Sequence, residues 1–433
     1  MRLSLVISSL ACGGSERVLS TIANFFAEPC RGWQVTLLTF DSGEEPFYRL
    51  HPAVEHHALA IQRLCGACPR GTHRNLRYLW KLRRALRRSR PDVILAFVDR
   101  SNVATLLASR GLGVPVVISE RVNPRHWPIG GAGWRGLRRL LYPRAAALVV
   151  QTRAAQSGYP AWLRPLTRVI PNPVVPREGA EQVPCTRPDG QTVIAAGRLV
   201  PQKGFDVLLQ AFARVAPCRP NWRLVIWGEG PERPALEALR TELSLDGRAS
   251  LPGVTPVLGR ELRGADLFVL SSRFEGFPNV LCEALASGLP AIASDCPDGP
   301  RELIRDGIDG LLVPRDNVAS LAGALERLMG DPALRCRLSA ATGAARERFA
   351  LERVMGLWSN TLRGAAGRAG YPAGDHASAA ASATAAPDRP AVAIDERLRL
   401  GQPLPHRPIS NCDASQPYRP ASLASSACGC GSG

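Results

Sequence analysis

The sequence has 433 residues, 45% of them hydrophobic, which is enough to build the cores of two or three domains. Basic residues outnumber acidic ones by 54 to 37, a formal net charge of +17 that favours an anionic partner or surface. No apolar run approaches the roughly 20 residues that a membrane-spanning helix needs. The short run Leu3–Leu10 leads into a glycine loop and an amphipathic pattern, so we expect a buried strand there rather than a secretory signal.

Short apolar runs alternate with helical patterns over residues 1–170. The expected strands are Leu3–Ile7, Val35–Thr39, Val93–Phe97, Val114–Ile118 and Ala147–Val150. The expected helices are Glu16–Phe26, Leu76–Arg88, Asn102–Ala108 and Trp134–Tyr142. Strict alternation of this kind predicts a doubly wound parallel sheet.

A proline-rich crossing, Val169–Val174, separates this series from a second one that begins at Val193. The second set of expected strands is Val193–Ala196, Leu224–Trp227, Leu267–Leu270, Ala291–Ala293 and Leu311–Val313. We therefore predict an α/β protein with one domain at 1–172 and another at 173–350. Ala, Ser, Pro and Gly dominate 365–433, a composition that buries too little apolar surface to fold and predicts a disordered tail.

The twelve cysteines have no spacing typical of a disulfide framework, so a reducing cytoplasm is the expected location. Cys65–Cys68 is a single CxxC without a second pair, and Cys428–Cys430 lies in the tail, so zinc is disfavoured at both. The chain contains no Asp-x-Asp, a common metal-bridging carboxylate motif. We predict no metal site.

Positive charge gathers in two stretches that also carry large apolar residues. Between Arg70 and Arg90 there are nine basic residues and no acidic one, with leucines and Trp80 threaded among them at helical spacing. A second cluster, Arg125–Arg144, mixes arginines with tryptophans and leucines. Such helices suit an anionic membrane surface, whereas the alternative is a solvated basic face. No recognised nucleic-acid motif accompanies them, so we expect no nucleic-acid partner.

Glu275 and Glu283 flank a turn, Gly276–Asn279, that follows the expected strand Leu267–Leu270. Ligands of open α/β sheets bind outside the carboxyl ends of the strands, where the next helix offers free N–H groups. Two carboxylates there can accept hydrogen bonds from sugar or ribose hydroxyls. The alternative is a helix start with favourable acidic residues.

Arg198 and Lys203 stand in an expected strand-to-helix loop, between Gly197 and Gly204. The glycines permit close approach of the backbone to a ligand, and the two cations suit phosphate oxygens. The alternative is a pair of solvent-facing cations.

These segments resemble the retaining glycosyltransferases of family 4, which have the GT-B fold. The matching segments, which span about 1–365, are Gly13–Val18, Ala195–Phe205, Leu224–Gly230, Glu275–Glu283, Ala284–Pro290 and Asp306–Pro314. The resemblance implies two Rossmann-like domains facing across a cleft, with a crossing helix at 351–364 that returns to the first domain.

The same resemblance implies which residues contact the donor. They are Gly13, Gly14, Arg198, Lys203, Glu275, Gly276, Phe277, Pro278, Asn279 and Glu283. Arg198 and Lys203 would bind the donor diphosphate, and Glu283 the ribose hydroxyls. Glu275, which forms the catalytic set with these two cations, would contact the transferred sugar, and Gly276–Asn279 would lie against it. No cofactor is expected beyond the nucleotide diphosphate sugar, for which a UDP-sugar is the expected identity.

Many family members carry a histidine after a middle strand of the first domain. Here that place reads Ser119–Pro124, so Glu120 or Arg121 is expected to face the cleft instead, and His126 lies beyond the proline. The Glu302 segment resembles a subgroup that builds bacterial surface polysaccharides or lipid-linked oligosaccharides, at the inner face of the membrane. The remaining alternatives are a silent sugar-nucleotide or membrane-surface binding protein and a GT-B nucleotide-sugar epimerase.

Overall fold

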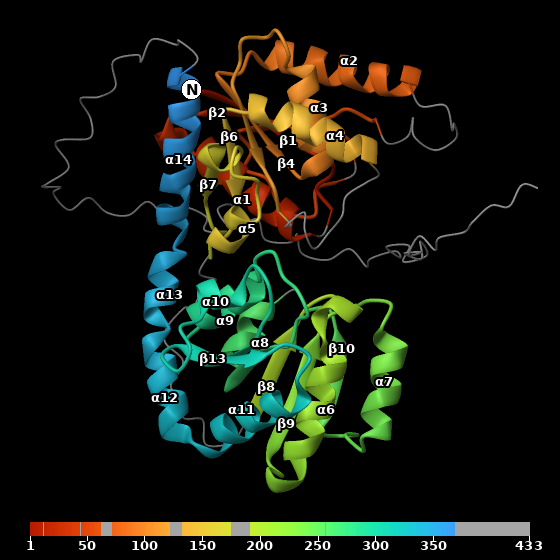
Figure 1. Ribbon diagram of the computed structural model, residues 1–433, viewed down its shortest axis with the longest axis vertical. Helices are drawn as coiled ribbons and strands as arrows, with labels where there is room; N and C mark the ends of the chain where they lie inside the picture. The colour runs from red at the N-terminus through yellow and green to blue at the C-terminus, as the bar shows by residue number, and fades with distance from the viewer. Residues whose placement is uncertain are drawn as a thin grey trace, which may run out of the picture.

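The computed structural model describes residues 1–368 except 12, 44, 62–71, 122–131, 175–190 and 256. The disordered tail predicted for 365–433 begins too early, because residues 365–368 end a helix and Ala365 is buried. The rest of that tail, from 369 onward, lies outside the described residues. Two parallel sheets, each covered by helices, form two domains stacked one above the other (Figure 1). The predicted fold class, α/β with two doubly wound domains, is confirmed.

The first sheet has seven parallel strands in the order β3-β2-β1-β4-β5-β6-β7. They are β1 (Arg2–Ile7), β2 (Gln34–Thr39), β3 (Val54–Ala58), β4 (Val93–Phe97), β5 (Val116–Ser119), β6 (Ala147–Val150) and β7 (Thr167–Val169). The helices of this domain are α1 (Gly14–Ala27), α2 (Thr72–Ser89), α3 (Asp99–Ala108), α4 (Ala132–Leu141) and α5 (Arg153–Ser157). The central strands are buried on both faces, as near-continuous apolar runs require.

The second sheet has six parallel strands in the order β10-β9-β8-β11-β12-β13. They are β8 (Gln191–Ala196), β9 (Trp222–Trp227), β10 (Ala249–Gly253), β11 (Leu267–Leu270), β12 (Ala291–Asp295) and β13 (Gly310–Pro314). The helices are α6 (Phe205–Val215), α7 (Arg233–Glu242), α8 (Leu258–Arg263), α9 (Asn279–Ala286), α10 (Pro300–Leu303), α11 (Val318–Gly330), α12 (Pro332–Ala341) and α13 (Gly343–Arg348). Strand order reverses between β8 and β11, so both strands end at the switch point where ligands bind.

The three strands that the sequence did not reveal, β3, β7 and β10, all lie at sheet edges. An edge strand is half exposed and lacks a long apolar run: β10 contains Pro252 and Gly253, and β3 contains His56 and His57. Edges tolerate such residues because one side of the strand makes no ladder hydrogen bonds.

The chain returns from the second domain to the first through α14 (Leu351–Arg368). Figure 1 shows α12, α13 and α14 as a column along one side of both domains. Val354, Met355, Trp358 and Leu362 of α14 are fully buried in the same cluster as the strands of the first sheet. Trp358 packs against Phe97 of β4, with ring centroids 5.8 Å apart. The last helix of the described residues is thus part of the first domain's core.

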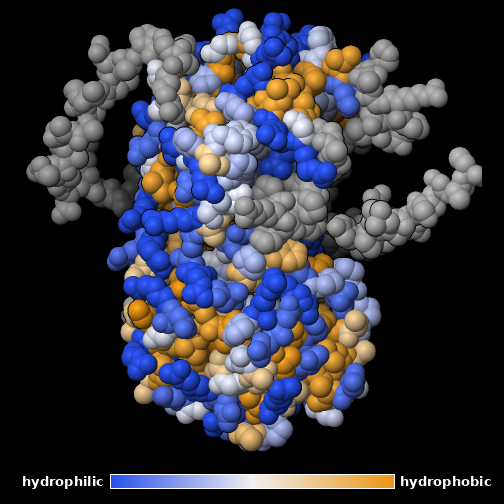
Figure 2. Space-filling model, in the orientation of Figure 1, coloured by the Kyte–Doolittle hydropathy of each residue, from blue (hydrophilic) through white to orange (hydrophobic). Residues whose placement is uncertain are grey.

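The two basic helices expose apolar side chains. Leu76 and Trp80 on α2 are 62% and 58% exposed, and Leu140 on α4 is 59% exposed. Figure 2 shows hydrophobic patches among hydrophilic ones in the upper part of the molecule, where α2, α3 and α4 lie. The opposite face of α2 packs on the core through Leu82 and Leu86. In the described part of the chain, no helix combines the length and apolar character needed to span a bilayer.

Cysteine pairing is limited among the described residues. Cys30, Cys218, Cys282 and Cys296 are free thiols, whereas Cys336 is disulfide-bonded. Cysteine spacing did not predict that bond. Burial raises the pKa of the Cys296 thiol to about 12, so this side chain stays neutral and unreactive.

Candidate active site

The loop that follows β8 is pressed against the end of β11. Gly204 ends a short 3₁₀ turn, Pro201–Lys203, with a φ of +62°. A Cβ atom at Gly204 would lie 2.2 Å from the carbonyl oxygen of Ser271, so only glycine fits. Ser271 Oγ in turn donates to the Lys203 carbonyl at 2.9 Å. These contacts fix the backbone that carries the Lys203 side chain.

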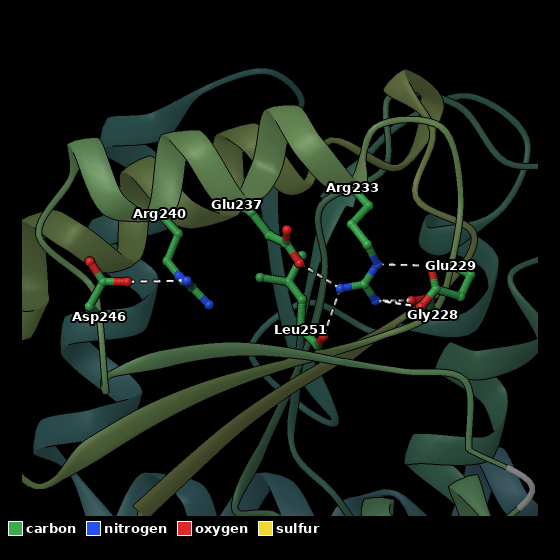
Figure 3. A network of polar contacts seen from close by, with 7 residues as sticks. All are labelled: Gly228, Glu229, Arg233, Glu237, Arg240, Asp246 and Leu251. Atoms are coloured by element: carbon green, nitrogen blue, oxygen red, sulfur yellow. Dashed lines mark hydrogen bonds and ion pairs between the residues drawn. The ribbon is translucent and has the colours of Figure 1, made fainter.

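A second glycine loop, Gly228–Gly230, packs against the loop that follows β8. A Cβ atom at Gly228 would lie 1.9 Å from the carbonyl oxygen of Gly197, and Gly197 N donates to Trp227 O at 2.9 Å. Arg233 holds the supporting loop in place (Figure 3): its guanidinium binds the Glu229 carboxylate at 2.6 and 2.8 Å and donates to the Leu251 carbonyl at 2.9 Å. Sequence reasoning missed Arg233.

Lys203 and Glu275 form an ion pair at the junction of the two loops. Lys203 Nζ lies 2.6 Å from Glu275 Oε1, and Ser272 Oγ donates to the same oxygen at 2.6 Å. Both side chains are largely buried. Arg198, in contrast, is exposed, and its side chain has no hydrogen bond or ion pair within the described residues. Two cations therefore stand at this edge, one paired and one free for a ligand.

The turn between the glutamates leads directly into α9. Phe277 packs edge-on against Phe349 in the core, with ring centroids 5.8 Å apart, so only its backbone remains for a ligand. The N–H groups of Phe277 and Asn279 make no hydrogen bond to any described residue. Because α9 begins at Asn279, Glu283 lies about one turn into the helix.

The glycine loop of the first domain meets α9 of the second. Gly13 precedes the first turn of α1, and a Cβ atom at Gly14 would lie 3.3 Å from Asn279 Nδ2. Arg17 Nη1 lies 2.5 Å from Glu283 Oε1, and Asn172 Nδ2 donates to Asn279 Oδ1 at 2.6 Å. The two domains are thus linked through the residues predicted to hold the donor. Arg17 and Asn172 were not predicted, although Arg17 stands in the same short segment as the two glycines.

The residues in place of the usual histidine have different surroundings. Glu120 is buried, accepts hydrogen bonds from Tyr142 Oη and from Arg138 Nη2 at 3.0 Å, and burial raises its pKa. It is therefore held inside the first domain. Arg121 donates to Asn172 Oδ1 at the domain junction, and burial lowers its pKa to about 9. His126 lies outside the described residues.

The site thus brings together most of the residues singled out in the sequence. Lys203, Glu275, Asn279 and Glu283 lie along one edge of the second sheet, Gly14 contacts them from the first domain, and Arg198 shares the loop of Lys203. Within the described residues, no group of three or more His, Cys, Asp or Glu side chains is placed to hold a metal ion. The arrangement offers cations, N–H donors and carboxylates, which suit an anionic ligand bearing hydroxyl groups.

Several known proteins are similar to this chain in sequence and in fold. Residues 13–173 match the model of a glycosyl transferase 4-like domain, and residues 190–331 match that of glycosyl transferases group 1. An α-1,4-N-acetyl-D-galactosaminyltransferase from Campylobacter jejuni, named for a glycan on PP-undecaprenol, is 30% identical over 78% of this chain and 91% of its own length.

Two further matches differ in extent. An exopolysaccharide phosphotransferase from Streptomyces coelicolor is 37% identical over 64% of this chain, which spans only 29% of that protein's length. The solved structure of Anabaena HepE in complex with UDP and glucose has a TM-score of 0.66 at 20% identity, covering 84% of this chain and 99% of its own, and so shares the GT-B fold. With both domains matched in order and the Campylobacter enzyme aligned over nearly its full length, the chain belongs to the group 1, family 4-like glycosyltransferases.

Proposed function

We propose that this glycosyltransferase moves a hexose or N-acetylhexosamine, with retention of anomeric configuration, from a nucleotide diphosphate sugar to a lipid-linked or polysaccharide acceptor of a bacterial surface glycan. One observation carries the proposal: Lys203, Glu275 and Glu283 converge with the start of α9 at the switch point of the second sheet. That edge offers cations to a diphosphate and carboxylates to hydroxyls.

The chemistry follows from the charges. The acceptor oxygen forms a bond to the anomeric carbon as the bond from that carbon to the diphosphate oxygen breaks. Arg198 and Lys203 stabilise the negative charge of the leaving diphosphate, so no metal is required in this scheme. The acceptor's proton passes to an oxygen of the departing phosphate on the same face of the sugar, and the free N–H groups of Phe277 and Asn279 orient the sugar.

The donor and acceptor classes draw support from relatives. HepE, which shares the fold, binds UDP and glucose, and a UDP-sugar is the donor we propose here. The Campylobacter relative is named for a PP-undecaprenol glycan, and we propose an acceptor of the same lipid-diphosphate kind. The exposed Leu76, Trp80 and Leu140, set among arginines, would rest on an anionic membrane at its inner face.

The test is nucleotide release from UDP-, GDP- and ADP-sugars, with and without a lipid extract that contains undecaprenyl-diphosphate sugars. We expect release from one donor, most strongly from a UDP-sugar, and a sharp rise when the extract is present. The anomeric configuration of the product, read by NMR coupling constants, tests retention.

Other outcomes separate the alternatives. Release of free sugar or of an isomer without any acceptor requirement would identify an epimerase-like reaction. Folded protein that binds nucleotide but releases none from any donor would identify a silent binding protein. Release that responds only to soluble sugars would contradict the membrane acceptor while leaving the glycosyltransferase reaction intact.

A further inference from the structure

One ion pair joins the two domains inside the proposed donor site. Arg17, in the first turn of α1, reaches Glu283 of α9, with 2.5 Å between Nη1 and Oε1. The two side chains are 22% and 11% exposed. Attraction to the Glu283 carboxylate raises the pKa of Arg17, so the guanidinium of Arg17 stays charged at any physiological pH.

The pair leaves one carboxylate oxygen unused. Glu283 Oε2 is buried and has no hydrogen-bond partner within the described residues. A buried acceptor without a partner costs free energy, so a ligand that supplies a donor is favoured at this atom. The charge of the carboxylate is already matched by Arg17, so the preferred donor is a neutral hydroxyl rather than a second cation.

The geometry also fixes the direction in which Glu283 presents this oxygen. Arg17 holds Oε1 on the side of the first domain, and the hydrogen bond from Asn172 to Asn279 holds the start of α9 beside it. Because turning the carboxylate over would break the ion pair at Oε1, Arg17 favours the orientation that leaves Oε2 for a ligand.

We propose that Arg17 is a positioning residue for the donor's ribose. It anchors Glu283 so that Oε2 accepts a hydrogen bond from a ribose hydroxyl, and the enzyme selects ribonucleotides only while the first domain supplies this anchor. The inference rests on the proposed function, because it takes the ligand at Glu283 to be a nucleoside diphosphate. Through Arg17, the first domain would contribute to the recognition of a nucleotide that the second domain binds.

The test measures Kd by calorimetry for UDP, GDP and ADP and for their 2′-deoxy and 3′-deoxy counterparts. We expect the wild-type protein to bind one ribonucleotide about tenfold or more tightly than its deoxy forms, the size expected for a hydrogen bond to a charged group. In Arg17→Gln that ratio should fall to about threefold or less, with weaker binding of the ribonucleotide. Arg17→Lys keeps the positive charge but loses the planar guanidinium with its several N–H donors. Its affinity ratio should therefore lie between those of the wild type and Arg17→Gln.

Arg31→Gln is the matched control. It removes another arginine of the first domain, whose exposed ion pair with Glu352 of α14 spans 3.1 Å. Arg31 lies near the start of β2, whereas the glycine loop follows the end of the parallel strand β1. Its ratio should equal that of the wild type. Glu283→Gln added to Arg17→Gln should cause little further loss, because both act on the same hydroxyl contact.

Two results would overturn the inference. An unchanged ratio in Arg17→Gln would mean that the pair only joins the domains, and tighter ribonucleotide binding would mean that Arg17 competes with the ligand for Glu283. Should Arg17→Gln fail to fold by circular dichroism, the ratio of Arg17→Lys decides. A wild-type protein that binds no nucleoside diphosphate would defeat the proposed function as well. A third result would contradict the inference but not the proposed function. Lys203→Ala would lose nucleoside diphosphate binding, whereas Arg17→Gln would keep the wild-type ratio of ribonucleotide to deoxynucleotide affinity.

Discussion

Lys203 carries the positive charge closest to the reacting centre in the proposed mechanism. Its ammonium is paired with Glu275, and a bound diphosphate would give it a second anionic partner. We expect Lys203→Ala to lower kcat by about 100-fold or more, the usual cost of removing one group that stabilises developing charge. The measurement is nucleotide release from the donor sugar under saturating conditions.

The chain offers a matched control for this change. Lys81 and Lys203 are the only two lysines in the sequence. Lys81 lies on α2 of the first domain and donates to the carbonyl of Leu59 at 3.3 Å. It is thus outside the donor loop, the segment Gly197–Gly204 of the second domain that carries Arg198 and Lys203. Lys81→Ala should keep its activity, and the circular dichroism spectrum of Lys203→Ala should match the wild type. Full turnover in Lys203→Ala would exclude the proposed role.

Gly204 sets the close approach of the donor loop to β11. Gly204→Ala places a methyl group 2.2 Å from the Ser271 carbonyl oxygen at a φ of +62°, so the loop must shift. We expect a loss of about 2 kcal/mol or more in the free energy of unfolding, together with a higher KM for the donor. Denaturant titration and donor kinetics measure the two effects.

Gly247→Ala separates the clash with Ser271 from the cost of placing an alanine at a positive φ. Gly247 has a φ of +74° but nothing within 4 Å of its added Cβ, so it reports the backbone cost alone, about 1 kcal/mol. An equal loss in both variants would mean that contact with Ser271 is unimportant. The KM for the donor should be unchanged in Gly247→Ala, because the residue lies outside the donor loop.

Some site residues could be found in the sequence and others could not, for a physical reason. Glu275, Glu283, Arg198 and Lys203 lie in short segments whose glycines and spacing are local, so the pattern is visible without the fold. The partner of Arg17 is 266 residues away in sequence, and no local spacing encodes such a contact. The same limit hid the contact between Asn172 and Asn279.

At the scale of elements, α7 controls the loop that supports the donor loop. Arg233 of α7 binds Glu229 of that loop, and the hydrogen bond from Arg233 lowers the pKa of Glu229 below its ordinary 4.5 (Figure 3). Arg233→Ala should cost about 1 to 2 kcal/mol of stability at pH 7, because charged hydrogen bonds to Glu229 and to the Leu251 carbonyl are lost. It should also raise the donor KM more than it lowers kcat.

The pH dependence of this cost has a definite sign. Because the folded-state pKa of Glu229 is depressed, its stabilisation is present above about pH 4.5 and is lost as pH falls through the folded pKa. Chemical denaturation at pH 7 and near pH 3 should therefore show a smaller difference between wild type and Arg233→Ala at the lower pH. A difference that grows on acidification would contradict this origin of the stabilisation.

The exposed face of α2 makes the membrane proposal testable. Arg84 lies over the Trp80 ring at 5.3 Å, so a cation and an aromatic ring occupy the same patch. Trp80→Ala should lower severalfold the fraction of protein that co-sediments with anionic vesicles, because the apolar contact of the ring is lost. Binding to neutral vesicles should be low in both proteins, because the charge contacts are missing there. Trp162→Ala, which removes a 48% exposed tryptophan outside α2 and α4, should leave binding unchanged.

The accuracy of the strand predictions depends on where a strand lies in its sheet. Interior strands such as β4 and β11 are buried on both faces, so their apolar runs mark them in the sequence. The missed edge strand β10 alternates buried and exposed residues and includes a proline, a pattern that also describes a loop. Sequence patterns thus locate the strands that carry the site, β8 and β11, more reliably than the sheet borders.

For the whole molecule, α14 ties the end of the described chain to the first domain's core. Trp358 is fully buried against Phe97, whereas its neighbour Leu357 is 40% exposed. Trp358→Ala should therefore lower the free energy of unfolding by about 3 to 5 kcal/mol, and Leu357→Ala by less than about 1 kcal/mol.

Hydrogen exchange can tell which domain loses protection in Trp358→Ala. We expect faster exchange in β1 and β4, which share a cluster with Trp358, and unchanged exchange in β8, which does not. Faster exchange confined to the second sheet would mean that α14 stabilises the domain preceding it in sequence, and not the one it crosses to.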